Sequence, residues 1–148
     1  MRISQKMIIL TLIILLGASL LLCFGKLFTN KQLSDIPKKN EISFIEIYGD
    51  YINDITKYHV IEGEGEITQI YDVLTSGKKI YTMESVNDIP YNVDGKLTKI
   101  ILVDSNNNTS LFVYQTNDGK YYIEKSYEGI YEISVEAYKI ITQYFITG

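Results

Sequence analysis

Residues 121–133 read YYIEKSYEGIYEI, and this stretch decides the fold. It holds four of the thirteen tyrosines of the chain. Its first five residues alternate in the manner of a strand, and Gly129 permits a bend before extended structure resumes. Adjacent strand residues point to opposite faces of a sheet. We therefore expect Tyr121 to join the core and Tyr122 to face solvent or a partner.

The flanking residues extend this pattern in both directions. Asn117-Asp118-Gly119 predicts a hairpin turn before the stretch, and Ser134 is a good N-cap for a helix after it. Periodicity predicts further strands and helices along the chain. The expected strands are 41–48, 55–61, 80–85, 97–104 and 109–115, and the expected helices are 66–76 and 135–146. Successive strands joined by hairpins predict an α+β fold, with a small, mainly antiparallel sheet and two helices on one face.

The N-terminal segment predicts a membrane anchor. Met7 to Phe24 is a run of 18 residues without a charge, and a helix of that length spans about 27 Å, close to the thickness of the hydrocarbon layer. Basic residues precede it, which favours a cytoplasmic N-terminus. We expect residues 1–26 to be a signal anchor, residues 27–40 a tether, and residues 41–148 a domain outside the cytoplasm. The protein would then be a single-pass protein of the cell membrane.

Two other interpretations of this segment remain open. Gly17-Ala18-Ser19 could be the cleavage site of a signal peptide. Cys23 could carry a lipid, although Leu22 precedes it where a lipoprotein signal has a small residue. Cys23 is the only cysteine, so residues 27–148 can form neither a disulfide nor a cysteine-ligated metal site.

The charge of the exported part limits its partners. Residues 27–148 contain 11 lysines and all 18 acidic residues, so their balance is 11 − 18 = −7. That balance disfavours nucleic acid as a partner. The negative balance has two interpretations: an acidic surface that keeps the domain soluble, or a surface that binds a basic partner.

The residues that most hydrolytic and metal sites require are scarce. His59 is the only histidine. A zinc site without cysteine needs more histidines, and a Ser or Cys triad needs a histidine near its nucleophile. We expect His59 instead on the exposed, polar face of a strand. Asp104 begins a run that resembles a calcium loop, but Thr109 and Gln115 stand where that loop has glycine and glutamate. We therefore expect no metal, no cofactor and no enzymatic activity, and a hairpin turn after Asp104.

Three segments resemble a known family. They are Ile36-Pro37 with Glu41 to Ile47, then residues 84–90 (ESVNDIP), then residues 121–131. Together they resemble an uncharacterised family of small exported proteins from Gram-positive bacteria, domain of unknown function 5301. Ser126 stands where that family has proline. The resemblance implies an exported domain and supplies no reaction and no catalytic residue.

Five residues of these segments are candidates for a binding site: Glu84, Asp88, Tyr122, Glu124 and Tyr127. Tyrosines are favoured on recognition surfaces, and paired carboxylates can hold a cation or transfer protons. Alternatively, Glu84 and Asp88 bind backbone N–H groups in turns, and Glu124 pairs with a lysine.

We expect a membrane-anchored extracytoplasmic binding module with a monomeric domain, whose partner is a protein or peptide of the envelope. An immunity- or inhibitor-type protein that neutralises a basic partner is one alternative. A carboxylate-dependent enzyme is another, and it would require Glu84, Asp88 and Glu124 to converge in one pocket.

Overall fold

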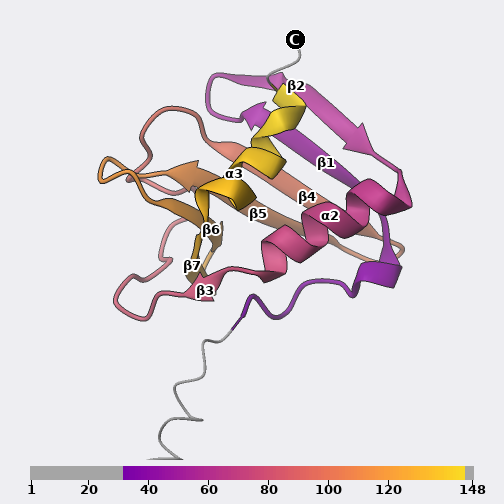
Figure 1. The fold of residues 1–148 in the computed structure, drawn as a ribbon, viewed down its shortest axis with the longest axis horizontal. Coiled ribbons are helices and arrows are strands. Elements are labelled where there is room, and N and C mark those ends of the chain that lie inside the picture. The colour runs from indigo at the N-terminus through magenta and orange to yellow at the C-terminus, as the bar shows by residue number, and fades with distance from the viewer. Residues whose placement is uncertain (1–31, 146–148) are drawn as a thin grey trace, which may run out of the picture. The chain divides into compact units, whose positions relative to one another are not determined.

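The computed structural model describes residues 32–145, and seven strands of this part form one antiparallel sheet (Figure 1). The order across the sheet is β2-β1-β4-β5-β6-β7-β3. The strands are β1 (Ile42–Asp50), β2 (Asp54–Ile61), β3 (Lys78–Lys79), β4 (Thr98–Asp104), β5 (Asn108–Gln115), β6 (Tyr121–Lys125) and β7 (Gly129–Ile133). All neighbouring strands are antiparallel. The predicted α+β class with an antiparallel sheet is confirmed.

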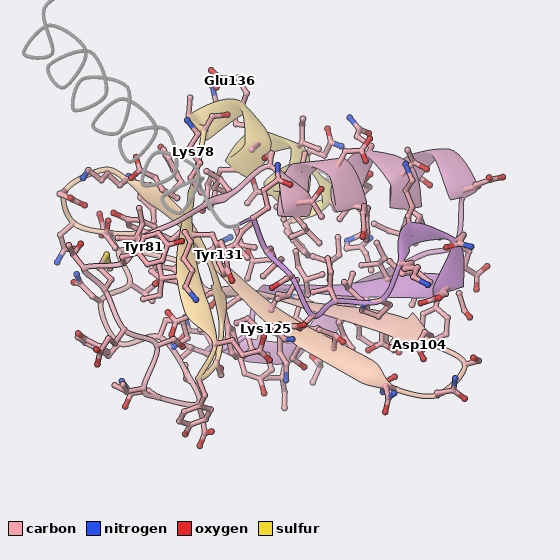
Figure 2. The ribbon with its side chains drawn as sticks, turned by 90° about the horizontal axis from the view of Figure 1, so that it is seen from below. Lys78, Tyr81, Asp104, Lys125, Tyr131 and Glu136 are labelled. Atoms are coloured by element: carbon pink, nitrogen blue, oxygen red, sulfur yellow. The ribbon has the colours of Figure 1, made fainter. Side chains whose placement is uncertain are left out.

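Two helices cover one face of this sheet (Figure 1 and Figure 2). They are α2 (Glu64–Thr75) and α3 (Val135–Thr142), and two single turns of 3-10 helix are η1 (Lys39–Glu41) and η2 (Gln143–Phe145). The apolar stripe of α2 buries Ile70 and Leu74, and that of α3 buries Ile141. These side chains pack against alternate residues of the central strands. Each such burial contributes about 1.5–3 kcal/mol, so this interface is the main core.

The start of α3 follows its predicted cap. Ser134 has extended backbone, and its hydroxyl oxygen accepts a hydrogen bond from the backbone N–H of Ala137 at 3.2 Å. The cap satisfies one of the free N–H groups at the start of a helix. The strand β7 is therefore followed by a helix after a single intervening residue.

The predicted strand over residues 80–85 is wrong. Only Lys78 and Lys79 pair with β7, and residues 80–97 form a loop on the face of the sheet opposite the helices. Its side chains Ile80, Met83 and Val93 pack against a second apolar cluster. That cluster consists of Leu97, Phe112, Tyr114, Tyr122 and Ile130. Apolar residues that suggest a strand thus cover a sheet instead of extending it.

Tyr121 and Tyr122 lie on opposite faces, as their adjacency requires. Tyr121 packs with the helix-side core, and its ring centroid is 4.5 Å from that of Tyr138. Tyr122 belongs to the second cluster and is only 4% exposed. The expectation that Tyr122 faces solvent is wrong, because the loop of residues 80–97 covers this part of the sheet.

The bend between β6 and β7 is made by a tyrosine. Tyr127 has a φ of 64°, whereas Gly129 has no positive φ and already pairs with Lys125. The N–H of Glu128 donates to the carbonyl of Lys125 at 3.0 Å. Positive φ at the third position of such a turn is the mark of type II geometry. The bend predicted at Gly129 is therefore two residues earlier.

The predicted membrane segment, Met7 to Phe24, lies outside the described residues, as do residues 27–31 of the predicted tether. Residues 32–40 of that tether are described, and among them Leu33 is buried in the main core. Within residues 32–145, neither helix has the length and apolar character needed to cross a membrane.

Candidate functional site

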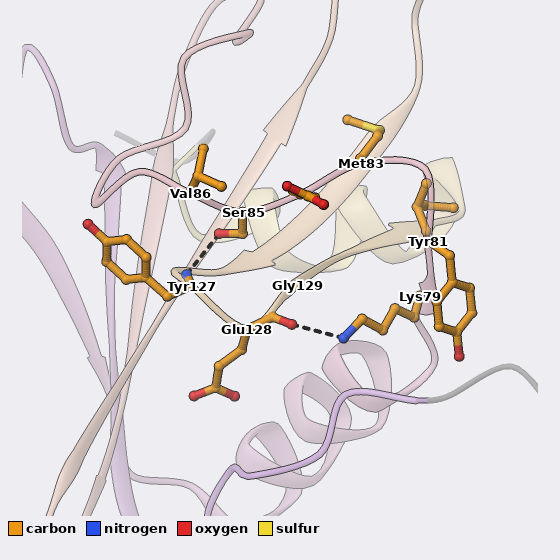
Figure 3. Close-up of a pocket in the computed structure, with 10 residues that line it drawn as sticks. Lys79, Tyr81, Met83, Ser85, Val86, Tyr127, Glu128 and Gly129 are labelled. Atoms are coloured by element: carbon orange, nitrogen blue, oxygen red, sulfur yellow. Dashed lines mark hydrogen bonds between the residues drawn. The ribbon is translucent and has the colours of Figure 1, made fainter.

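Ser85 joins two segments that are far apart in the sequence. Its hydroxyl donates to Oε1 of Glu124 at 2.6 Å. Ser85 Oγ also accepts a hydrogen bond from the backbone N–H of Tyr127 at 3.0 Å (Figure 3). Ser85 lies on the loop of residues 80–97, and the other two residues belong to β6 and the turn that follows it. One buried hydroxyl thus connects the 84–90 and 121–131 segments.

Glu124 is a buried carboxylate held by hydroxyl groups. It is 4% exposed, and its second oxygen, Oε2, accepts from the phenol of Tyr114 at 2.8 Å. Burial raises the pKa of the Tyr114 phenol, and the hydrogen bond to Glu124 raises it further. Tyr114 is therefore a protonated donor at neutral pH. Glu124 makes no ion pair with a lysine of the described residues, so the alternative of a lysine partner is wrong.

A second contact holds the turn after β6. The phenol of Tyr127 donates to Oδ1 of Asp88 at 2.9 Å, and the hydroxyl of Ser126 donates to the backbone carbonyl of Asp88 at 3.0 Å. The hydrogen bond with Asp88 raises the pKa of Tyr127. A left-handed conformation costs a non-glycine residue about 1–2 kcal/mol. The contacts of Tyr127 with Asp88 and Ser85 offset that cost.

Two pockets lie beside the loop that carries these contacts. The first has a volume of about 320 Å³ and is lined by Lys79, Tyr81, Glu84 and Tyr127, among others (Figure 3). In it the ammonium of Lys79 donates to the backbone carbonyl of Glu128 at 2.9 Å. This pocket therefore already contains a cation of the protein itself.

The second pocket has a volume of about 410 Å³. Its polar lining is Thr82, Glu84, Tyr91, Asn92, Tyr114 and Glu124, and its remaining walls are apolar. We call it the acidic pocket. It brings an exposed carboxylate from the loop and a buried one from β6 to the same space.

The predicted site residues are thus only partly brought together. Glu84 and Glu124 line one pocket, whereas Asp88 binds Tyr127 and does not line that pocket. Tyr122 lies in the apolar cluster below the loop. Three converging carboxylates, which a carboxylate-dependent enzyme would need, are not found in either pocket. Among residues 32–145 there is also no group of three or more His, Cys, Asp or Glu side chains that could hold a metal ion.

Sequence reasoning missed Ser85, Tyr91 and Tyr114. Ser85 lies inside the 84–90 segment, so its position in a family-like motif was a usable signal. Tyr114 shares a face with Phe112 by strand alternation, but the residue that its hydroxyl meets depends on the register between β5 and β6. No pattern in the sequence of the loop indicates that Tyr91 would line a pocket.

Two other sequence features have structural roles. His59 is exposed on β2, as expected. Asp104 accepts from the backbone N–H groups of Asn106 and Asn107 through Oδ1, at 2.6 and 2.7 Å. Its carboxylate closes the turn between β4 and β5, which confirms the hairpin interpretation.

Comparisons with known proteins agree with this architecture. The family model DUF5301, described as "Domain of unknown function (DUF5300)", matches residues 30–132. A protein from Ruminococcus gnavus, solved by NMR, has a similar fold with a TM-score of 0.55 and 28% sequence identity, over 70% of this chain and 97% of that one. No curated protein matches this chain. Because the family model spans more than half of the chain, this protein belongs to the DUF5301 family.

Proposed function

We propose that this protein is a membrane-anchored, extracytoplasmic module that binds a protein or peptide of the cell envelope. Met7 to Phe24 would cross the cell membrane, with residues 41–148 outside the cytoplasm. The uncharged run and the basic residues before it support this arrangement. A binding role is favoured over a catalytic one because the candidate carboxylates are divided between separate contacts.

One observation carries the binding proposal. Five large apolar side chains are exposed on the loop of residues 80–97 and on the turn after β6, beside the two pockets. They are Tyr81, Val86, Ile89, Tyr91 and Tyr127, and the most exposed is Tyr91 at 82%. We call this surface the loop face. Exposed apolar groups beside pockets are typical of interaction sites, and tyrosine is favoured there.

A second exposed apolar surface competes with the loop face. Ile52, Ile55, Tyr58 and Val60 are exposed on β2 and on the turn before it. β2 is an edge strand, and Lys57 in its middle is the type of residue that discourages strand pairing. The loop face is favoured because hydrogen bonds from Ser85 and Tyr127 hold it to the sheet. A preorganised surface loses less entropy on binding.

Site-specific photo-crosslinking in cells tests which surface binds. A photoreactive phenylalanine analogue replaces Tyr91 of the full chain, and in a matched variant it replaces Tyr58. We expect a crosslinked partner from position 91 and none from position 58. Crosslinking from position 58 alone would overturn the assignment to the loop face, and its absence from both positions would overturn the binding role.

Fractionation tests the anchor separately. The full chain is compared with a chain that begins at Lys31 and keeps the rest of the sequence. We expect the full chain in the membrane fraction and the shortened chain in the soluble fraction. Equal partition of the two would contradict an anchor at Met7 to Phe24. Cleavage of the domain by a protease added to intact protoplasts would support the outside position of residues 41–148.

An immunity- or inhibitor-type role is a second proposal. The surplus of −7 charges after residue 26 suits a basic partner. Capture of a basic protein that weakens steeply as salt is raised would favour it. Capture that is insensitive to salt would count against it.

A further inference from the structure

We infer that the acidic pocket binds an alkylammonium group, such as the side chain of a lysine in a bound peptide. This inference deepens the proposed binding function and depends on it. It follows from the charges that line the pocket, from the burial of Glu124 beside neutral donors, and from the aromatic groups at the rim.

The charge of the lining distinguishes this pocket from its neighbours. The acidic pocket contains the carboxylates of Glu84 and Glu124 and no cationic side chain. Each of three other pockets in the described part of the chain is lined by at least one lysine. Lys79 lines the first pocket, Lys39 lines another, and Lys57 and Lys96 line the third. In those pockets the protein supplies its own cation. The acidic pocket leaves that position to a ligand.

Glu124 gives a physical reason for a bound cation. A buried carboxylate loses its hydration and is costly unless a charge and hydrogen bonds compensate it. Ser85 and Tyr114 supply hydrogen bonds at 2.6 and 2.8 Å, but both donors are neutral hydroxyls. An ammonium in the pocket would supply the opposite charge. The hydroxyls also hold the carboxylate in place before the ligand arrives.

The aromatic groups favour an organic cation. Tyr114 lines the pocket wall, and Tyr91 stands at its rim with 82% of its surface exposed. Cations bind the faces of such rings, and ammonium groups are recognised in this way. The chain has an internal parallel, since the ammonium of Lys99 lies 4.4 Å from the ring centroid of Tyr51. Apolar walls suit the methylene stem of a lysine better than a bare metal ion.

NMR titration of the isotope-labelled full chain, kept in a neutral detergent, tests the inference. The probe is Nα-acetyl-lysine N-methylamide, and the control is the norleucine analogue, which has a similar stem and no charge. We expect the lysine probe, but not the norleucine control, to shift the backbone amides of Tyr91 and Asn92 with a millimolar dissociation constant. A titration with cadaverine shows whether a free diamine binds as well as a peptide lysine.

Matched variants connect the binding to the pocket. We expect Glu84→Gln and Tyr91→Ala each to weaken binding of the lysine probe about twofold to fivefold, as loss of one exposed ion pair or cation–π contact would. The controls are Glu66→Gln, which removes an exposed carboxylate from α2, and Tyr58→Ala, which removes an exposed tyrosine from β2, outside the loop face. We expect both controls to leave the dissociation constant unchanged.

Several results would overturn the inference. These are equal binding of the norleucine control, shifts confined to residues away from the acidic pocket, unchanged binding in Glu84→Gln, and no binding of the lysine probe. If crosslinking from position 91 still captures a partner, only the alkylammonium inference fails and the proposed function stands. If crosslinking fails as well, the proposed function fails with it.

Discussion

Replacing Ser85 by alanine tests whether the loop of residues 80–97 is held to the sheet through a single hydroxyl. Ser85→Ala removes the 2.6 Å hydrogen bond to the buried carboxylate of Glu124. A hydrogen bond to a charged group contributes about 1.5–3 kcal/mol. The variant also leaves the N–H of Tyr127 without its 3.0 Å acceptor, and a neutral hydrogen bond contributes about 0.5–1.5 kcal/mol.

The two losses share one atom and overlap, so we expect the free energy of unfolding to fall by about 2–4 kcal/mol. A domain of this size loses about 4 °C of melting temperature per kcal/mol. The expected decrease is therefore about 8–16 °C, measured by thermal denaturation of the full chain with the near-ultraviolet signal of the tyrosines.

Ser126→Ala is the matched control for this experiment. It removes one hydroxyl from the same region and loses one 3.0 Å hydrogen bond to the carbonyl of Asp88. We expect a loss of about 0.5–1.5 kcal/mol from this variant. If Ser85→Ala cost no more than Ser126→Ala, the loop would be held by its apolar contacts alone, and the role given to Ser85 would be refuted.

Three further predictions concern the central stretch and its contacts. Tyr122→Ala should lower the free energy of unfolding by about 3–5 kcal/mol, measured by denaturant titration. This loss should be at least as large as that of Tyr121→Ala, because Tyr122 is 4% exposed whereas Tyr121 is half-buried. A clearly smaller loss from Tyr122→Ala would show that the loop does not cover this face. Gly129→Ala should cost less than about 1 kcal/mol by the same titration, because its φ is not positive and the added methyl group crowds only the end of the flexible Lys79 side chain, while the Tyr131 ring lies at ordinary contact distance. A larger loss would indicate strain at this position. The raised pKa of Tyr114 means that the unfolded chain loses this proton near pH 10 while the folded chain keeps it. Stability should therefore be full below about pH 10 and fall above it, and Tyr114→Phe should make that alkaline loss less steep; an unchanged slope would contradict the burial of this phenol.

The helices and most of the strands could be predicted from local patterns. Apolar residues at helical spacing in α2 and Ser134 before α3 need only short-range physics. The same holds for the turns, since Asp104 closes its turn with its own neighbours. Alternation also separated Tyr121 from Tyr122, because adjacent strand residues cannot share a face.

The loop of residues 80–97 shows where local patterns are insufficient. Ile80 and Met83 are apolar whether they extend a strand or cover a sheet, so composition alone cannot distinguish the two. The outcome depends on β7, which pairs with Lys78 and Lys79 and leaves the next residues to cross the opposite face. Burial of Tyr122 follows from that crossing, and it is a contact between segments about 40 residues apart.

The arrangement of the candidate site also depends on contacts between segments that are distant in the sequence. The sequence alone determined that Glu84, Asp88 and Glu124 lie in family-like segments, that residues 27–148 have no cysteine, and that their charge is strongly negative. Only the tertiary structure decided that Glu124 is buried between Ser85 and Tyr114, that Glu84 shares its pocket, and that Asp88 does not. The physical reason is that a hydrogen bond or a pocket requires atoms within a few ångströms. The strand register and the path of a long loop set those distances, and neither is encoded by neighbouring residues.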